Sequence, residues 1–245
     1  MITGEKFKSL FREAQFRPGP LAVFVNPCYF ARKGLYGHIR ALATEIRGKT
    51  LDIGCGQKPY QSLFPSSEYI GLEIDTPENR KHKKADVFYD GTVFPFGEAE
   101  FDSIVINEVF EHVINPDGFL SEVSRVLKPS GVLLMTVPFV WEEHDSPRDF
   151  VRYSSFGLSA ILQRHGFQVL SLRKSVDDIR VVFQLITGYI YKKTATRSGL
   201  INGLLTLLLI APFNLLGELL GIILPKNDAL YLDNVVLARK TQPSD

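Results

Sequence analysis

The stretch LDIGCGQKPY, residues 51–60, decides the fold of this chain. A short apolar run is interrupted by an aspartate, and two glycines then flank a single cysteine. Gly54 and Gly56 can take positive φ and carry no side chain, so the backbone around them can lie close against a bound molecule. The stretch predicts a strand that ends in a ligand-binding loop, and the rest of the chain must indicate which ligand.

Predicted helices and strands alternate along the chain around this loop. Residues 38–47 place apolar side chains at i, i+3, i+4 and i+7, which is typical of an amphipathic helix. Residues 101–107, FDSIVIN, form the apolar run expected of a parallel strand buried on both faces. Other predicted helices lie within 117–131, with a stop signal at 128–131, and at 154–166; other predicted strands are 50–53, 68–75, 132–137, 167–174 and 231–240. The alternation predicts an α/β fold whose ligands bind at the carboxyl ends of the strands.

Composition excludes several classes of protein. With 28 basic and 27 acidic residues the formal charge is +1, which gives no electrostatic reason to expect a nucleic-acid partner. Two cysteines, Cys28 and Cys55, are too few for a disulfide framework, so a cytoplasmic location fits best. The first twenty residues lack the apolar core of a signal peptide. The length of 245 residues indicates one α/β domain with an extension.

The loop favours one class of cofactor. A dinucleotide fingerprint needs a third glycine, but residues 57–59 are Gln, Lys and Pro. Asp52 would repel a pyrophosphate and suits a ligand that carries an amino group. Glu73 follows Gly54 by nineteen residues, close to the spacing at which an acid accepts the hydroxyls of a ribose. A nucleoside joined to a charged amino acid is S-adenosylmethionine (SAM), so the sequence predicts this cofactor.

Four motifs follow one another in the chain: LDIGCG, YIGLEID, DGTVFPFGEAEFDSIVINEVFEHV and FLSEVSRVLKPSGVLLMTVPF. In this order they resemble the class I, seven-strand SAM-dependent methyltransferases, over about residues 40–175 plus the final strand. The resemblance implies a doubly wound, mostly parallel seven-stranded sheet with helices on both faces. It also implies a cofactor site with three parts. The first motif, Asp52, Gly54, Cys55 and Gly56, surrounds the methionine moiety. Glu73 binds the ribose and Asp90 the adenine, and Asn107 and Glu108 line the cofactor cleft.

Each acidic residue in this set also has a purely structural interpretation. Asp52 could cap the loop, Asp90 could hold its own turn, and Glu73 could be a solvated strand end. The stretch DVFYDGTVFP, residues 86–95, is longer than the family pattern and leaves open whether Asp86 or Asp90 contacts adenine. Asp75 could likewise replace Glu73. Cys55 is given no redox role.

The acceptor side is predicted in PFVWEEHDSPRDFVRY, residues 138–153, which follows the fifth strand. His144 is the candidate general base for a hydroxyl acceptor, because an imidazole can take up a proton at neutral pH. Arg152 and Tyr153 are candidate substrate-binding residues, although an ion pair of Arg152 with a nearby acid is an open alternative. The segment resembles an HExPxDFxRY signature of methyltransferases encoded near polysaccharide and other secondary biosynthesis pathways, with Asp145 in place of the usual glutamate.

Local structure offers a competing explanation for part of this segment. Ser146, Pro147 and Asp149 have the pattern of a capped short helix. The pair Glu111 and His112 is interpreted as structural, and no metal site is predicted.

The apolar stretch GLINGLLTLLLIAPFNLLGELLGIIL, residues 199–224, carries a single charge, Glu218. It is long enough to span a bilayer. Pro212 is expected to break it into a helical hairpin, and Glu218 would be costly in hydrocarbon. A hairpin that covers the acceptor site, forms a homodimer interface or touches a membrane surface is predicted, with burial in protein favoured over membrane contact.

The predicted organisation has four parts: an N-terminal helical or irregular segment, the SAM-binding core, the apolar helical insertion, and the last strand with its tail, at residues 1–37, 38–175, 176–228 and 229–245. The predicted function is a SAM-dependent methyltransferase acting on a small-molecule, glycan-type or lipid-linked acceptor, on oxygen. A catalytically inactive, membrane-associated SAM-binding scaffold is the alternative, and a nucleotide-cofactor oxidoreductase is disfavoured by the missing third glycine. Location is predicted as cytoplasmic, with membrane association left open.

Overall fold

The computed structural model describes residues 15–242 and divides the chain into two compact units. The sheet unit consists of His38–Arg173 and Asn234–Asp245, and the helical unit consists of Met1–Gly37 and Lys174–Asp233. Both units are therefore built from segments that lie far apart in the sequence. The chain passes between the units after Gly37, Arg173 and Asp233.

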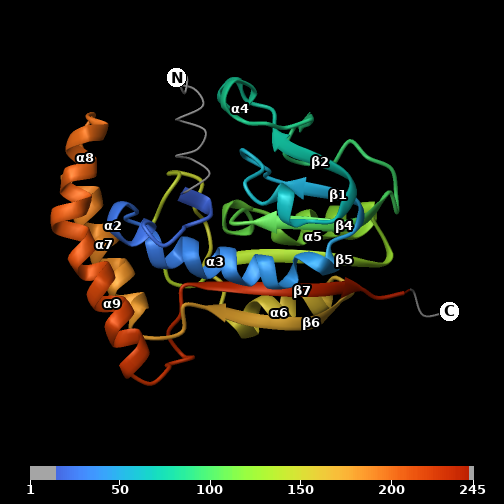
Figure 1. The fold of residues 1–245 in the computed structure, drawn as a ribbon. Helices are drawn as coiled ribbons and strands as arrows, with labels where there is room; N and C mark the ends of the chain where they lie inside the picture. The colour runs from blue at the N-terminus through green and yellow to red at the C-terminus, as the bar shows by residue number, and fades with distance from the viewer. Residues whose placement is uncertain (1–14, 243–245) are drawn as a thin grey trace. The chain divides into compact units, whose positions relative to one another are not determined.

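The sheet has seven strands in the order β3-β2-β1-β4-β5-β7-β6 (Figure 1). The pairs β1–β2, β1–β4, β2–β3 and β4–β5 are parallel. β7 lies between β5 and β6 and points the opposite way in Figure 1, so the sheet is mixed. The strands are β1 (Gly48–Ile53), β2 (Ser66–Ile74), β3 (Val87–Tyr89), β4 (Phe101–Asn107), β5 (Leu127–Pro138), β6 (Phe167–Ser175) and β7 (Asp233–Lys240). The Rossmann-like α/β fold expected from the sequence is confirmed.

The central strands are buried on both faces, as their continuous apolar sequences predict. In β4 the consecutive residues Ile104, Val105 and Ile106 are all fully buried. Side chains from α5 (Pro116–Val126) and α6 (Ser155–Arg164), among them Leu120 and Leu162, pack into the same core. This core fixes the carboxyl edge of β1, β4 and β5, where the candidate site lies.

Local signals explain where the helices of the sheet unit begin. α5 starts behind Asn115, whose side chain accepts from the Gly118 amide, and α6 starts behind Ser154, whose side chain accepts from the Gly157 amide. One boundary prediction is wrong, because residues 128–131 are not a loop but belong to β5, which begins at Leu127. Other helical elements that carry residues of the sheet unit are α3 (Tyr29–Leu42), whose first half lies in the helical unit, η1 (Ala43–Glu45), η2 (Gln61–Leu63), α4 (Pro77–His82) and η3 (Phe110–His112).

The helical unit contains α2 (Ala22–Val25), α7 (Arg180–Thr194), α8 (Gly199–Leu205), the π-helix η4 (Thr206–Ile210) and α9 (Ala211–Ile223). The predicted break at Pro212 is wrong. Pro212 lies in the first turn of α9, where a missing N–H costs little, and the π-turn before it carries the chain through without a loop. Gly199–Ile223 is thus one continuous helix of 25 residues, long and apolar enough by length and composition to cross a membrane. The hairpin partner of this helix is α7, which lies alongside it (Figure 1).

Polar side chains fasten the inner face of this helix to the rest of the helical unit. Asn214 is fully buried, and its Nδ2 donates to the carbonyl oxygens of Val23 and Asn26 at 2.9 and 3.2 Å. Glu218, the one charge in the apolar stretch, forms an ion pair with Lys33 at 2.5 Å and lies 3.7 Å from Arg180. These two basic partners offset the free-energy cost of placing a charged residue in an apolar helix.

The outer face of the same helix is exposed and apolar. Only 28% of its most apolar stretch is buried within the described residues. Six of the exposed side chains are spaced three, four or seven residues apart, which places them on one stripe of the helix: Leu200, Leu204, Leu208, Leu215, Leu219 and Ile222. The expectation that protein covers this stretch is not met by the described part of the chain.

Candidate functional site

The glycine loop after β1 is held open beside the end of β2. Gly54 and Gly56 adopt φ of +68° and +54°, a region that favours glycine. A Cβ at Gly54 would lie 2.4 Å from Val109 Cγ2, whereas a Cβ at Gly56 would meet no atom within 4 Å. The loop is therefore packed against the protein on one side and has open space on the other, as a close approach to a ligand requires.

Glu73 stands at the end of β2 and reaches across to this loop. Its carboxylate is buried, with 7% of the residue exposed, and Oε1 accepts from the Gly56 amide at 2.8 Å. Its place beside the loop, rather than at a solvated strand end, is the arrangement expected of the ribose-binding acid. Asp75, the open alternative, is instead bonded to Arg80 by two hydrogen bonds of 2.6 and 2.7 Å.

Asp52 lies beneath the loop and is 3% exposed. Its Oδ2 accepts from the Tyr69 hydroxyl at 2.8 Å. Burial raises the pKa of Asp52 to about 7, since the hydrogen bond from Tyr69 and the charge of Lys58 only partly offset the loss of water. A cationic ligand group placed nearby would favour the ionised form of this carboxyl.

Gly71, in the middle of β2, supports the loop from below and was missed by the sequence prediction. A Cβ there would lie 2.4 Å from Lys58 Cε and 2.6 Å from Cys55 Sγ. The Gly71 amide also donates to Asp86 Oδ2 at 2.6 Å. A glycine inside a strand often marks a close approach of another part of the chain, so Gly71 within the predicted strand YIGLEID could have indicated this contact. Cys55 is buried here, and burial raises the pKa of its thiol.

The two candidate adenine acids are both engaged in local hydrogen bonds. Asp90 Oδ1 accepts from the amide and the hydroxyl of Thr92 at 2.8 and 2.7 Å, and so holds its own turn. Asp86 binds the Gly71 amide and forms an ion pair with Lys58. Asp90 lies just beyond the end of β3, and both carboxyls belong to exposed residues.

Asn107 and Glu108 end β4 next to the loop. Asn107 Oδ1 is buried and has no hydrogen-bond partner in the part of the chain that the structure describes. Glu108 takes φ of +52°, and its amide donates to the carbonyl and the hydroxyl oxygens of Thr136, each at 3.1 Å. A positive φ at a non-glycine residue at a strand end is a strained arrangement of the kind that clusters at functional sites.

The segment after β5 contains no helix, so the predicted capped helix at Ser146 is wrong. Asp149 does not complete a capping box; its Oδ2 instead accepts a hydrogen bond from the His144 amide at 2.9 Å. Both carboxylate oxygens of Asp149 also receive the Arg152 guanidinium at 2.6 Å. These charge-assisted bonds hold the pKa of Asp149 well below its usual range. Arg152 thus adopts the ion pair that the sequence left open as its alternative.

Tyr153 is half-buried and stacks on Phe110, with ring centroids 5.0 Å apart and planes 20° apart. Its carbonyl oxygen accepts from Asn234 Nδ2 at 2.8 Å. The ring therefore joins the start of α6 to η3.

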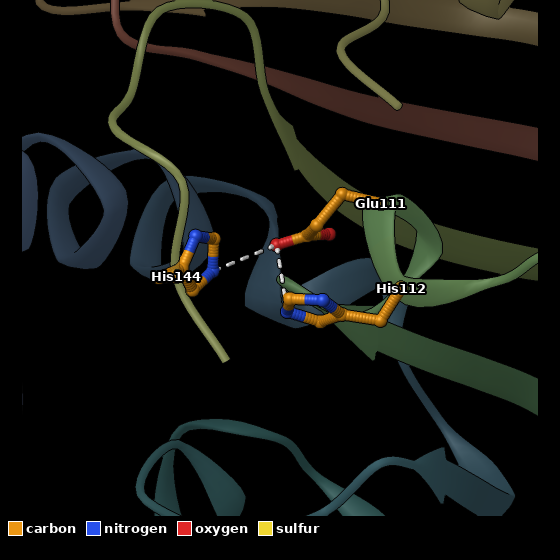
Figure 2. A group of neighbouring side chains, drawn as sticks. All are labelled: Glu111, His112 and His144. Atoms are coloured by element: carbon orange, nitrogen blue, oxygen red, sulfur yellow. Dashed lines mark ion pairs between the residues drawn. The ribbon is translucent and has the colours of Figure 1, made fainter. Parts of the chain in front are cut away.

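Glu111, His112 and His144 converge at the carboxyl edge of β4 and β5 (Figure 2). The His144 and His112 rings meet edge to face with centroids 4.8 Å apart. Glu111 Oε1 lies 3.7 Å from His112 Nε2 and 3.8 Å from His144 Nε2. Burial, with the charge of Glu108 next, raises the pKa of Glu111 to about 9. The sequence prediction treated Glu111 and His112 as structural, because only the fold brings His144 beside them.

Known proteins resemble the part of the chain that forms this edge. Residues 51–135 match the family model described as a methyltransferase domain. An uncharacterised methyltransferase of Mycolicibacterium gilvum is 32% identical over 108 residues, which are 40% of this chain and 42% of that protein. A fatty-acid O-methyltransferase of Mycolicibacterium smegmatis is 31% identical over 111 residues, 40% of each protein. The chain thus matches about two fifths of the length of these curated relatives.

Solved structures share the fold over most of its length. A SAM-dependent methyltransferase from Archaeoglobus fulgidus superposes with a TM-score of 0.53 at 18% identity, over 95% of this chain and 99% of that one. The [4+2]-cyclase SpnF superposes with a TM-score of 0.57 at 16% identity, over 97% and 95% of the two chains. At this level of identity the likeness concerns the fold alone, and the cyclase illustrates that one fold hosts different reactions.

Proposed function

We propose that the chain is a class I, Rossmann-like methyltransferase and that it transfers the methyl group of SAM to an oxygen of a hydrophobic or lipid-linked acceptor. SAM is the cofactor that the domain family uses, and the loop at Gly54–Gly56 is its binding place. The single observation that carries the proposal is the contact of Glu73 with the Gly56 amide beside the open face of the loop. One carboxylate thereby stands where a ribose and an aminoacyl group would meet.

The step itself is an in-line displacement. A lone pair of the acceptor oxygen attacks the methyl carbon, and the electrons of the carbon–sulfur bond pass to sulfur, which leaves S-adenosylhomocysteine (SAH). The protein supplies alignment, since the sulfonium is already activated. We assign the hydroxyl proton to His144 Nε2. The nearest neighbours of Nδ1 are acceptors, Asp149 Oδ2 at 3.2 Å and the Glu142 carbonyl oxygen at 3.3 Å, and the donor Arg152 Nη2 lies farther away at 3.5 Å, so we place the proton of a neutral ring on Nδ1.

A hydrophobic acceptor is favoured by two observations. The relative from Mycolicibacterium smegmatis is named for an O-methylation of fatty acids. In addition, the helix Gly199–Ile223 presents an apolar stripe that the described residues leave exposed. An enzyme whose acceptor resides in a membrane gains from a surface that rests on that membrane.

We assign the stripe to contact with an anionic lipid surface. Exposed Lys192 and Lys193 in the last turn of α7 and exposed Arg197 just before α8 would lie near anionic headgroups. A full crossing is less consistent with the topology, because β6 before the helical insertion and β7 after it both belong to the one sheet. The chain would have to cross back through α7, which has 15 residues against the roughly 20 that a span requires.

Label transfer tests the proposed activity. The protein is incubated with SAM labelled in its methyl group and with the organic-solvent extract or the aqueous extract of cells. Label is expected in the organic-soluble fraction, and His144→Gln is expected to lower its rate by about 100-fold or more, within the range for loss of a general base. Binding of SAH without transfer to either extract would establish the inactive scaffold instead.

A further inference from the structure

Glu111 lies at the centre of an unusual grouping of hydrogen-bond acceptors. The residue is fully buried, and neither of its carboxylate oxygens has a hydrogen-bond partner among residues 15–242. Buried carboxylates are normally satisfied by donors, because leaving a charged group without partners costs several kcal/mol. Figure 2 shows that the side chains facing Oε1 are the two histidine rings, one from η3 and one from the segment after β5.

The tautomer of each ring follows from its second nitrogen. His112 Nδ1 lies 2.7 Å from the Arg148 carbonyl oxygen, which can only accept, so Nδ1 carries the proton. His144 Nδ1 lies 3.2 Å from Asp149 Oδ2 and 3.3 Å from the Glu142 carbonyl oxygen, closer than the donor Arg152 Nη2 at 3.5 Å, so we assign its proton to Nδ1 as well. In their neutral forms both rings therefore turn a lone pair on Nε2 toward Glu111 Oε1. When Glu111 is ionised, three acceptor atoms converge and no other described residue places a donor between them; the metal-free protein can supply one by protonating Glu111.

We propose that Glu111, His112 and His144 bind a divalent first-row transition metal ion. The three ligand atoms lie within 4.8 Å of one another. Metal bonds of 2.0–2.2 Å place tetrahedral neighbours roughly 3.4 Å apart. The observed 3.7 and 3.8 Å from Glu111 need to close by a few tenths of an ångström, and the two histidine nitrogens, which lie within 4.8 Å of each other, can need a larger ring movement. Two imidazole nitrogens with one carboxylate suit Zn²⁺, Co²⁺ or Mn²⁺ better than Mg²⁺ or Ca²⁺, which prefer oxygen ligands.

The surroundings have the features of a built metal site. The contacts of His112 with the Arg148 carbonyl and of His144 with Asp149 are the outer hydrogen bonds that orient ligating histidines. The Phe150 and Val151 amides donate to the Glu111 carbonyl at 3.0 and 3.3 Å, which ties the two ligand-bearing segments together. Asp145 Oδ2, 4.0 Å from His112 Nε2, is placed to add a fourth ligand.

The role of the ion rests on the proposed function, whereas its binding does not. A cation at this edge would hold the acceptor oxygen and lower the pKa of its hydroxyl, as metal ions do for bound water. In the metal-loaded protein the Nε2 lone pair of His144 would coordinate the ion, so the hydroxyl proton would leave to solvent and His144 would act as the general base only in the metal-free protein. The oxygen would then attack the methyl carbon as before.

Titration of the metal-free protein with Co²⁺ alone tests the site, read by visible absorption and by calorimetry. One Co²⁺ ion per chain is expected, with binding weakened at least 100-fold in Glu111→Gln and in His112→Gln. Asp149→Asn is expected to weaken it about 10- to 100-fold, as loss of an orienting partner does. The matched control is His165→Gln, since His165 pairs with Asp117 at 2.8 Å and is not one of the three clustered ligands, and it should bind Co²⁺ like the wild type.

Two results would overturn the site: no Co²⁺ binding by the wild-type protein, or equal affinity in Glu111→Gln. SAH binding by each variant reports whether the sheet unit is folded, so that a misfolded variant is not counted. If Co²⁺ binds as described but no methyl is transferred, the proposed function fails while the site stands. If transfer is equally fast after chelation, the catalytic role of the ion is wrong.

Discussion

Glu73 is the residue whose loss should affect cofactor binding most directly. Glu73→Ala removes a charge-assisted hydrogen bond, worth about 1.5–3 kcal/mol. SAH is therefore expected to bind at least about tenfold more weakly, as measured by calorimetry. Glu78→Ala, an exposed glutamate in the first turn of α4, is the matched control and should bind SAH like the wild type. Unchanged affinity in Glu73→Ala would remove Glu73 from the site.

Asp52 predicts how the stability of the ligand-free protein depends on pH. Its folded-state pKa of about 7 lies above the ordinary value of 3.8, so its contribution to stability is fully present below about pH 4 and is lost as the pH rises through 7. Above pH 7 the folded protein must bury an ionised Asp52, which lowers the free energy of unfolding by a few kcal/mol relative to its value below pH 4. Chemical unfolding from pH 5 to 8 should show a fall in the free energy of unfolding that is smaller in Asp52→Asn. Identical pH profiles would show that Asp52 is not the buried acid described.

At the residue scale the sequence predicts those groups that a local pattern specifies. Gly54, Gly56 and Glu73 follow from motif spacing, and the structure brings all three together. Glu111 could not be recognised in this way, because its partner His144 lies thirty-three residues further along the chain and reaches it only through the fold. Residues that meet only through the fold have no characteristic spacing in the sequence, so a motif search does not find them.

Gly71 in β2 connects strand packing to the loop above it. Gly71→Ala would place a methyl group 2.4 Å from Lys58 Cε and 2.6 Å from Cys55 Sγ, so the loop must shift. We expect a loss of about 1–3 kcal/mol in the free energy of unfolding, the usual cost of overpacking, together with weaker SAH binding. Denaturant unfolding and calorimetry measure the two effects.

Gly188, in the interior of α7, is the matched control for this substitution. A Cβ there meets no atom within 4 Å, and alanine favours a helix over glycine by up to about 1 kcal/mol. Gly188→Ala should therefore be neutral or stabilising and leave SAH binding intact. Equal destabilisation by both substitutions would contradict the account of Gly71.

At the element scale the long periodic segments are predicted well and their boundaries less so. β4 is predicted residue for residue, since a run of apolar β-branched side chains has one good placement. The break predicted at Pro212 is wrong because a proline in the first turn of a helix does not end that helix. The π-helix at Thr206–Ile210, which precedes it, has no sequence signal of its own. The capped helix expected at Ser146 fails because Asp149 binds His144 and Arg152 instead.

On the scale of the whole molecule, the exposed stripe of Gly199–Ile223 predicts membrane binding. Flotation with phosphatidylcholine vesicles that contain phosphatidylglycerol should carry the wild-type protein upward. Leu204→Glu combined with Leu208→Glu, two exposed positions on adjacent turns, should abolish flotation. Val93→Glu, the same change at an exposed apolar residue of the sheet unit, should float like the wild type.

Two outcomes would contradict the assignment of this surface to lipid. One is a wild-type protein that stays with the soluble fraction. The other is a double variant that still floats. If the substitutions instead convert a dimer into a monomer in solution, the stripe is an interface between two copies of the chain.

The fold could be predicted because the alternation of elements specifies it, but the division into two units could not. The helical unit joins the segment before residue 38 to the insertion after residue 173. Its contacts, such as the hydrogen bond from Asn214 to Val23, connect positions 191 residues apart. No sequence pattern in either segment indicates that the two segments pack together. Long-range pairing of this kind becomes visible only in three dimensions.

Calorimetry with SAH and, in parallel, with NAD tests the central claim most directly, namely that the loop at Gly54–Gly56 and the carboxylate of Glu73 form a SAM site. The account predicts that SAH binds at a single site per chain and that NAD does not bind. Binding of NAD, or of neither compound, would contradict it.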